Sequence, residues 1–246
     1  MRCVAPLVGL AFVGATMMAV AQQPAQLSVG RFSAAAEGTA LPNGWRMLTF
    51  KKIERHTRYE VVKDQSMTVV KAVSEASASG LTKAVTIDPH EYPIVRWRWK
   101  IENILDKSDV NRKDGDDYPA RLYITFAYEP DKVSFGKKLK YKAGQAVFGD
   151  IPIGAINYIW DSKSPVGTVV DNAFTSFAKM IVVESGARRI GSWVQEERNV
   201  YEDYRQAFGE EPPAINGIAI MTDTDNTKEH AVAYYGDIEF VRSPPK

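Results

Sequence analysis

Apolar and polar residues alternate with a period of two through most of the chain after residue 45. In "IVRWRWKIE", Trp97 and Trp99 fall on one side of an extended strand, and charged residues fall on the other. Short segments of the same kind, rich in Val, Thr and aromatic residues, are separated by polar or Gly/Pro turns. This spacing predicts an all-β protein and not an alternation of strands and helices. Besides this strand, the segments expected to be extended are 45–51, 59–63, 67–74 and 81–87.

A second long strand is predicted in "ARLYITFAY", where Leu122 and Ile124 form the apolar side. Its alternation matches that of "IVRWRWKIE", so we expect the two strands to be antiparallel neighbours that cover the same core. Their outer faces would then form one polar surface. We expect this surface to be functional, because so many polar residues on one sheet face would be costly in a core and are not required on a surface without a ligand. The residues expected on that surface are Arg96, Arg98, Arg121 and Tyr123.

Two segments depart from the strand pattern. Residues 131–150 are basic and contain helix formers, which indicates a loop with a short helix. The run "VYEDYRQAFGEEPP" spaces aromatic residues three to four apart and ends in Gly209 and a pair of prolines, so it predicts one short helix. The predicted fold is therefore an all-β, antiparallel, jelly-roll-like β-sandwich with one or two short helices.

The N-terminus has the features of a secretory signal peptide. Arg2 precedes a charge-free apolar run that ends in "AVA", with small residues at the positions that signal peptidases require. We expect cleavage after Ala21 and no stable membrane span afterwards, since the run is short for a transmembrane helix. The predicted organisation is a signal peptide at 1–21, a tether at 22–29, a single domain at 30–242 and a tail at 243–246.

Removing the signal peptide changes the charge and the cysteine count. Without Arg2, 30 basic residues face 30 acidic ones, which argues against a nucleic-acid-binding protein. The only cysteine, Cys3, leaves with the same segment, so disulfides, thiol nucleophiles and cysteine metal sites are excluded. His56, His90 and His230 lack metal-binding spacing.

Several longer motifs resemble one protein family. "DGDDYPARLYITF", "NYIWDSKSPVGT", "KMIVVESG" and "YEDYRQAFGEEPP…TDTDNT…YGDI" are similar to the bacterial domain of unknown function 3047 family, across residues 30 to 241. The resemblance implies a bacterial β-sandwich that is periplasmic or secreted, and it implies no activity. More loosely, "GTALPNGW" near the start and "YYGDIEF" near the end resemble carbohydrate-binding jelly rolls, in which the first and last strands pair.

The stretch "DVNRKDGDDYPARLYITF" raises the question of a calcium loop. An EF-hand loop starting at Asp109 would accept Asn111 at its third position. However, Lys113 then takes a ligand position, Gly115 comes one residue late, and Ala120 stands where a bidentate Glu is needed. The EF-hand register therefore fails.

Three interpretations of this loop remain open. It could be an irregular calcium loop that uses Asp114, Asp116 and Asp117, or an ordinary polar turn. Alternatively, Asp116 or Asp117 could hold Arg98 or Arg121, because a paired carboxylate orients a guanidinium toward the hydroxyls or carboxylate of a ligand.

A second acidic loop lies in "MTDTDNTKE". Asp223, Asp225 and Asn226 have the alternating spacing that offers oxygen ligands to calcium. The competing interpretation is a turn at the end of a strand, held by side-chain bonds to the backbone. We expect no cofactor other than this possible calcium ion.

Aromatic residues supply a further candidate site, because the apolar faces of sugar rings stack on exposed aromatic rings. By alternation Trp97 and Trp99 belong to the core. Trp160 in "NYIWDSKSPVG" is expected at a strand end beside a loop, and thus exposed. Asn157, Tyr158 and Trp160 therefore form the predicted cluster for a stacked, hydrogen-bonded ligand.

The leading hypothesis is an exported, non-catalytic protein that binds a glycan or another polar envelope molecule. Arg98 and Arg121 would bind its anionic or hydroxyl groups, Asp116 or Asp117 would orient them, and Tyr158 or Trp160 would stack. The alternatives are a polysaccharide lyase or glycosidase on the same scaffold, and a structural envelope protein without a small ligand. In an enzyme, the acid or base would be Glu184, Glu197 or Tyr123.

Overall fold

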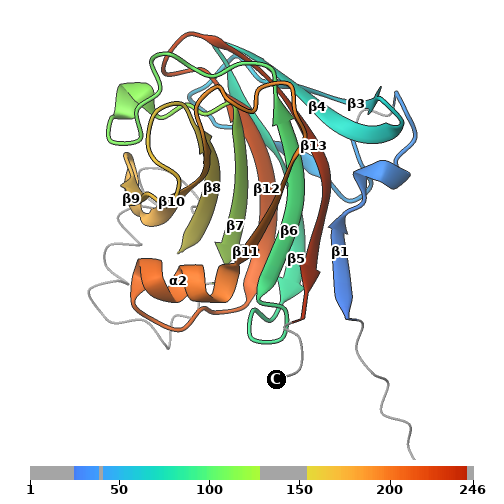
Figure 1. The fold of residues 1–246 in the computed structure, drawn as a ribbon, viewed down its shortest axis with the longest axis vertical. Helices are drawn as coiled ribbons and strands as arrows, with labels where there is room; N and C mark the ends of the chain where they lie inside the picture. Colours follow the sequence, from blue (N-terminus) through green and yellow to red (C-terminus); the bar gives the residue numbers. More distant parts are fainter. Residues whose placement is uncertain (1–24, 39–40, 128–153, 243–246) are drawn as a thin grey trace, which may run out of the picture.

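The computed structural model describes residues 25–38, 41–127 and 154–242 (Figure 1). In these ranges a six-stranded sheet, here sheet A, packs face to face on a seven-stranded sheet, sheet B. The predicted all-β sandwich is therefore confirmed. The predicted signal peptide, the loop at 131–150 and the tail at 243–246 lie outside the described residues.

Sheet A is antiparallel throughout its described strands, and β13 lies at its centre. The strand β1 (Gln26–Gly30) pairs with β13, as the likeness to jelly rolls implies, so residues 26–29 belong to the domain and not to a tether. The path through the other strands runs β11 (Val194–Asn199), β6 (Ile94–Ile101), β13 (His230–Val241), β4 (Met67–Glu75) and β3 (Arg58–Asp64).

Sheet B is antiparallel except for one pair of strands. β8 and β10 run parallel, so the chain crosses over between them and returns through the short β9. The order is β2 (Arg46–Leu48), β5 (Ala78–Ile87), β12 (Ile215–Asp223), β7 (Ala120–Phe126), β8 (Ala155–Asp161), β10 (Thr175–Ser185) and β9 (Val169–Asn172).

The predicted pairing of β6 with β7 is wrong. β6 lies between β11 and β13 in sheet A, and β7 lies between β12 and β8 in sheet B. The two strands do share a core, because they face each other across the sandwich. Their polar sides consequently point in opposite directions, and Arg98 and Arg121 lie on opposite outer faces of the molecule.

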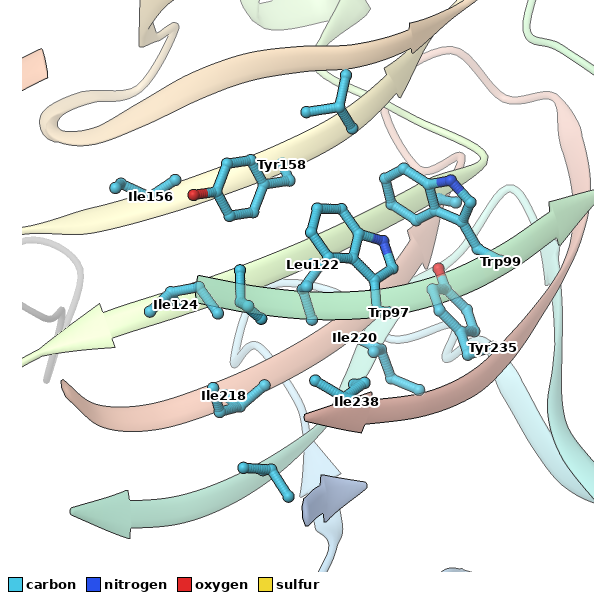
Figure 2. Close-up of a cluster of buried hydrophobic side chains, with 14 of the residues drawn as sticks. Trp97, Trp99, Leu122, Ile124, Ile156, Tyr158, Ile218, Ile220, Tyr235 and Ile238 are labelled. Atoms are coloured by element: carbon cyan, nitrogen blue, oxygen red, sulfur yellow. The ribbon is translucent and has the colours of Figure 1, made fainter. Parts of the chain in front are cut away.

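The core fills the space between the two sheets. Figure 2 shows Trp97 and Trp99 of β6 pointing from sheet A toward Tyr158 of β8 in sheet B. The rings of Trp97 and Tyr158 stack with centroids 5.1 Å apart, and those of Trp99 and Trp160 lie 6.2 Å apart. Burying a large apolar side chain contributes about 1.5–3 kcal/mol, so these aromatic residues are major determinants of the fold.

One end of the core is closed by α2 (Val200–Phe208), at the bottom of Figure 1. Asn199 caps the helix by accepting a hydrogen bond from the backbone of Glu202, and Gly209 ends it in the left-handed conformation that glycine favours. Tyr204 packs on Phe126 with ring centroids 4.4 Å apart. The short helix predicted from the sequence is therefore confirmed.

Candidate functional site

Three loops meet at the end of the sandwich opposite α2, which we call the loop end. They are residues 102–119 between β6 and β7, residues 162–168 between β8 and β9, and residues 224–229 between β12 and β13. The first loop contains the 3-10 helix η2 (Lys113–Gly115). The two acidic loops of the sequence are thus neighbours, because β7 and β12 pair directly.

Arg121 is the centre of a buried polar network at this end. Its Nε donates to Asp223 Oδ1 at 2.7 Å, and its Nη2 donates to Asp223 Oδ2 and to the backbone carbonyl of Asp116. Its Nη1 donates to the hydroxyl of Tyr123 at 3.0 Å, and its guanidinium lies 4.4 Å from the ring centre of Tyr118. Only 2% of this side chain is exposed, so its orientation is fixed by these partners.

The acidic partners of Arg121 differ from those expected. Asp116 contacts it, through the backbone carbonyl and through a carboxylate oxygen 3.6 Å from Nη1. Burial raises the pKa of Asp116, and the attraction to Arg121 only partly opposes this rise. The strongest partner is Asp223, which the sequence had suggested only as a metal ligand.

Asp117 ties the two acidic loops together instead of holding an arginine. Its Oδ2 accepts the backbone N–H of Thr227 at 2.6 Å, and its Oδ1 accepts the amide of Asn226 at 3.1 Å. The Asp117 side chain is fully buried. Asp117 therefore fixes the position of residues 226–227 relative to the rest of the loop end.

Three carboxylates at the loop end could hold a cation. Asp117, Asp223 and Asp225 each offer one oxygen, and these oxygens lie within 4.8 Å of one another. Oxygen ligands of this kind suit calcium. A cation would have to compete with Arg121 for the oxygens of Asp223. Asp114 takes no part, because it forms an exposed ion pair with Arg112.

A polar cavity of about 440 Å³ opens beside this network. Thr227 and Asn226, which Asp117 holds in place, form part of its wall. The ammonium group of Lys107 donates to the carbonyl of Thr227 at 3.2 Å. Its volume is in the usual range of ligand sites, and its lining is polar throughout. The complete lining is Lys107, Asp109, Arg112, Asp114, Lys163, Asn226 and Thr227.

Several buried polar atoms around the network have no hydrogen-bond partner. They include the hydroxyl of Thr227 in the cavity wall, whereas Asp116 Oδ1 has its ion-pair contact with Arg121. On the outer face of sheet B, Asn157 donates to the sulfur of Met180, and its Oδ1 has no partner. A buried polar group without a partner costs about 1–3 kcal/mol, so this region favours a bound polar molecule or water.

Three of the predicted ligand residues lie elsewhere. Arg98 is on the outer face of sheet A, where it contacts Met67 and Trp193. Tyr158 and Trp160 are fully buried in the core (Figure 2 shows Tyr158), so neither presents a ring to a ligand. The expectation that Trp160 is exposed is wrong because Ile156, Tyr158 and Trp160 alternate onto the inner face of β8.

The candidate catalytic carboxylates also fall in different places. Glu197 points outward from β11 and pairs with Arg96 at the surface. Glu196 is on the inner side of the same strand, where it accepts a hydrogen bond from the indole of Trp99 at 3.2 Å. Burial, followed by the charge of Glu184, raises the pKa of Glu196 to about 7. Glu184 therefore has Glu196, and not Glu197, as its acidic neighbour.

Tyr123, the third catalytic candidate, lies beside Arg121 on the outer face of sheet B. Its hydroxyl accepts a hydrogen bond from the guanidinium of Arg121 at 3.0 Å. Burial raises the pKa of Tyr123 to about 12. Its hydroxyl therefore stays protonated at neutral pH, which makes it a poor base.

Comparison with known proteins gives a family and a set of related folds. A sequence model of the family described as "Protein of unknown function (DUF3047)" matches residues 43–239. No curated protein sequence matches the chain. In the described ranges no helix is long and apolar enough to cross a membrane.

Among solved structures, the chain is similar to three sugar-binding domains. The family 11 carbohydrate-binding module of a Clostridium thermocellum cellulase is 7% identical, with a TM-score of 0.43 over 92% of this chain and 99% of that one. The carbohydrate recognition domain of Emp47p is 10% identical, with a TM-score of 0.43 over 88% and 95%. The acidic lectin of winged bean is 9% identical, with a TM-score of 0.37 over 89% and 100%. Values this low carry no inference about a ligand.

Proposed function

This chain belongs to the DUF3047 family of proteins of unknown function. We propose, from the site at its loop end, that it is an exported, non-catalytic binding protein. Its ligand is a glycan or another polar envelope molecule, held in the loop-end cavity. The predicted signal peptide at residues 1–21 is the basis for placing it in the bacterial periplasm or outside the cell.

The observation that carries this proposal is the polarity of the cavity wall. Among the described residues, neither Lys107 nor Lys163 pairs with a carboxylate, whereas Arg112 is neutralised by Asp114. The hydroxyl of Thr227 is buried there without a partner. A ligand that brings hydroxyl or anionic oxygens would pair with both ammonium groups.

The buried network supports the cavity by keeping its wall in place. Arg121 and Asp223 lock β7 to β12, and Asp117 fixes residues 226–227, so the groups facing the ligand are positioned before it binds. Preorganised polar groups lower the entropic cost of binding. Tyr123 and Asn157, beside Arg121 and Met180, would extend the polar surface along the outer face of sheet B.

Isothermal titration of the purified protein, guided by an array of neutral and acidic glycans, tests the proposal. We expect Lys163→Gln to weaken binding of the best array hit by tenfold or more, about 1.4 kcal/mol, without lowering the melting temperature. The matched control is Lys52→Gln, at an exposed lysine outside the cavity. An array without any hit, or equal affinities in both variants, contradicts the proposal.

One observation favours a second candidate function, a glycosidase or lyase. Glu196, with a pKa of about 7, and its neighbour Glu184 would be the acid and base, in place of Glu184 with Glu197. Release of reducing ends or unsaturated uronates from polysaccharides by the wild type, abolished in Glu196→Gln, would support this function. Without such release the protein is a binding protein or a structural envelope protein.

A further inference from the structure

The outer face of sheet A carries an aromatic and apolar surface that the loop-end cavity does not reach. Val69, Val232 and Tyr234 are buried there, although they point away from the core between the sheets. Met67 and Trp193 pack against them and stay partly exposed. Such a surface is unusual on the outer side of a sandwich, where polar residues normally face water.

Trp193 is the most accessible tryptophan of the protein. The other four, Trp45, Trp97, Trp99 and Trp160, are each at most 6% exposed. The indole of Trp193 is held in place, because its Nε1 donates to Asp64 Oδ2 at 2.7 Å. The same oxygen accepts the ammonium of Lys100 at 2.7 Å. The ring is therefore held in a fixed position, and the guanidinium carbon of Arg98 and the ammonium of Lys100 lie over it, each 5.5 Å from its centre.

Arg98 lies over this ring without an acidic partner among the described residues. Its guanidinium carbon is 5.5 Å from the ring centre of Trp193, and its Nη1 contacts the sulfur of Met67. Within the described residues no carboxylate pairs with it. Gly236 makes room for this placement, because a Cβ atom there would lie 2.3 Å from Arg98 Nε and 2.4 Å from Arg98 Cγ.

The surroundings of Arg98 add positive charge. Lys71 and Lys100 lie 5.6 Å and 4.2 Å from the ring centre of Tyr234. Asp64 neutralises Lys100, and Glu102 accepts the hydroxyl of Tyr234. The positive charge of Arg98 therefore has no paired carboxylate among the described residues. The fork of N–H groups of its guanidinium matches the two oxygens of a carboxylate.

We propose that the surface formed by Trp193 and Arg98 is a second binding site, specific for an acidic pyranose of the uronic acid class. The apolar face of the sugar ring stacks on the exposed side of Trp193, and its carboxylate pairs with Arg98. A small inorganic anion would use the arginine but not the indole, whereas a neutral sugar would use the indole but not the charge. An acidic sugar uses both.

The test is a titration of the ¹⁵N-labelled protein with a trimer of galacturonic acid, followed at the backbone amide signals of residues 98 and 193 and, wherever Trp193 is present, also at its indole N–H signal. We expect these signals to shift, and the affinity to fall tenfold or more in Arg98→Gln and in Trp193→Leu with unchanged melting temperature. The neutral galactose trimer should bind at least tenfold more weakly. Gly236→Ala, which displaces Arg98, should reproduce the loss seen in Arg98→Gln.

The results that would overturn this proposal differ from those that would overturn the proposed function. No shift at trimer concentrations of about 5 mM, or equal affinity in Arg98→Gln, eliminates the Trp193–Arg98 site. Lys163→Gln should leave the Trp193 signal and its titration unchanged. If Lys163→Gln abolishes binding of the acidic trimer while Arg98→Gln does not, the loop-end cavity is the binding site and this second site is refuted.

Discussion

Arg121 and Asp223 form a two-point ion pair between neighbouring strands although 102 residues separate them in the chain. Their side chains are only 2% and 3% exposed. Removing one partner of such a pair leaves an uncompensated buried charge. We therefore expect Asp223→Ala to lower the free energy of unfolding by about 3–5 kcal/mol, measured by urea denaturation.

An exposed ion pair in the same region supplies the control for this experiment. Asp114 and Arg112 pair at the surface of the loop that contains η2. Asp114→Ala should cost less than about 1 kcal/mol, as is usual for solvent-exposed pairs. Similar losses in the two variants would mean that the Arg121–Asp223 pair is not buried in solution.

Glu196 should make stability depend on pH. Its folded-state pKa of about 7 lies above its usual 4.5, so folding favours the protonated form. The contribution of Glu196 to the free energy of unfolding is fully present below pH 4.5 and is lost as the pH rises through 7. The loss is at most on the order of 3 kcal/mol. The charged groups facing Glu196 are Glu184, Arg189 and Arg198.

Thermal unfolding of a Glu196→Gln variant tests this dependence. The neutral amide should remove most of the fall between pH 5 and pH 8 and raise the melting temperature at pH 8. Glu197→Gln is the matched control, since Glu197 is exposed and pairs with Arg96. If the wild type and both variants show the same slope with pH, Glu196 titrates at its ordinary value.

Calcium should have little effect on stability. Both oxygens of Asp223 already accept hydrogen bonds from Arg121, so the three carboxylates of Asp117, Asp223 and Asp225 offer an incomplete set of ligands. We expect the same melting temperature in 1 mM calcium and in excess chelator. A rise of several degrees with calcium, lost in Asp225→Asn, would instead establish a metal site.

Truncating Trp160 should cost much more stability than truncating Trp193. Trp160 is fully buried and donates to the carbonyl of Gly186 at 3.1 Å, so Trp160→Ala should cost about 3–5 kcal/mol. Trp193→Ala should cost much less, because that ring packs on the outer face of sheet A. Denaturation curves with equal midpoints for both variants would contradict their assigned positions.

The sequence was sufficient to predict the strands but not their partners. A period of two tells which side chains share a face, and Trp97, Trp99, Leu122 and Ile124 do share one core. The same alternation is expected whether two strands pair in one sheet or face each other across the core. The pairing of β6 with β7 was therefore not determined by the pattern.

The candidate site was predictable only in part. The sequence linked Asp116 or Asp117 to Arg98 or Arg121 because the acidic loop joins the strands that carry the two arginines, and the structure has Asp116 in contact with Arg121. The link to Asp223 depends on β7 and β12 being neighbours, which a single sequence does not encode locally. Trp160 was misplaced even though its two-residue spacing from Tyr158 already indicated the core. Lys107 and Lys163 have no pattern that distinguishes them from other surface lysines.

The central position of β13 has a consequence for the order of folding. This strand, the last of the described chain, pairs with β6 and β4 and also with β1. Because the chain is synthesised from its N-terminus, sheet A cannot be completed until residues 230–241 have been made. Contacts this distant in sequence slow folding. Sheet A can therefore close only after nearly all of the polypeptide has left the ribosome, so we expect it to form after synthesis and not during it.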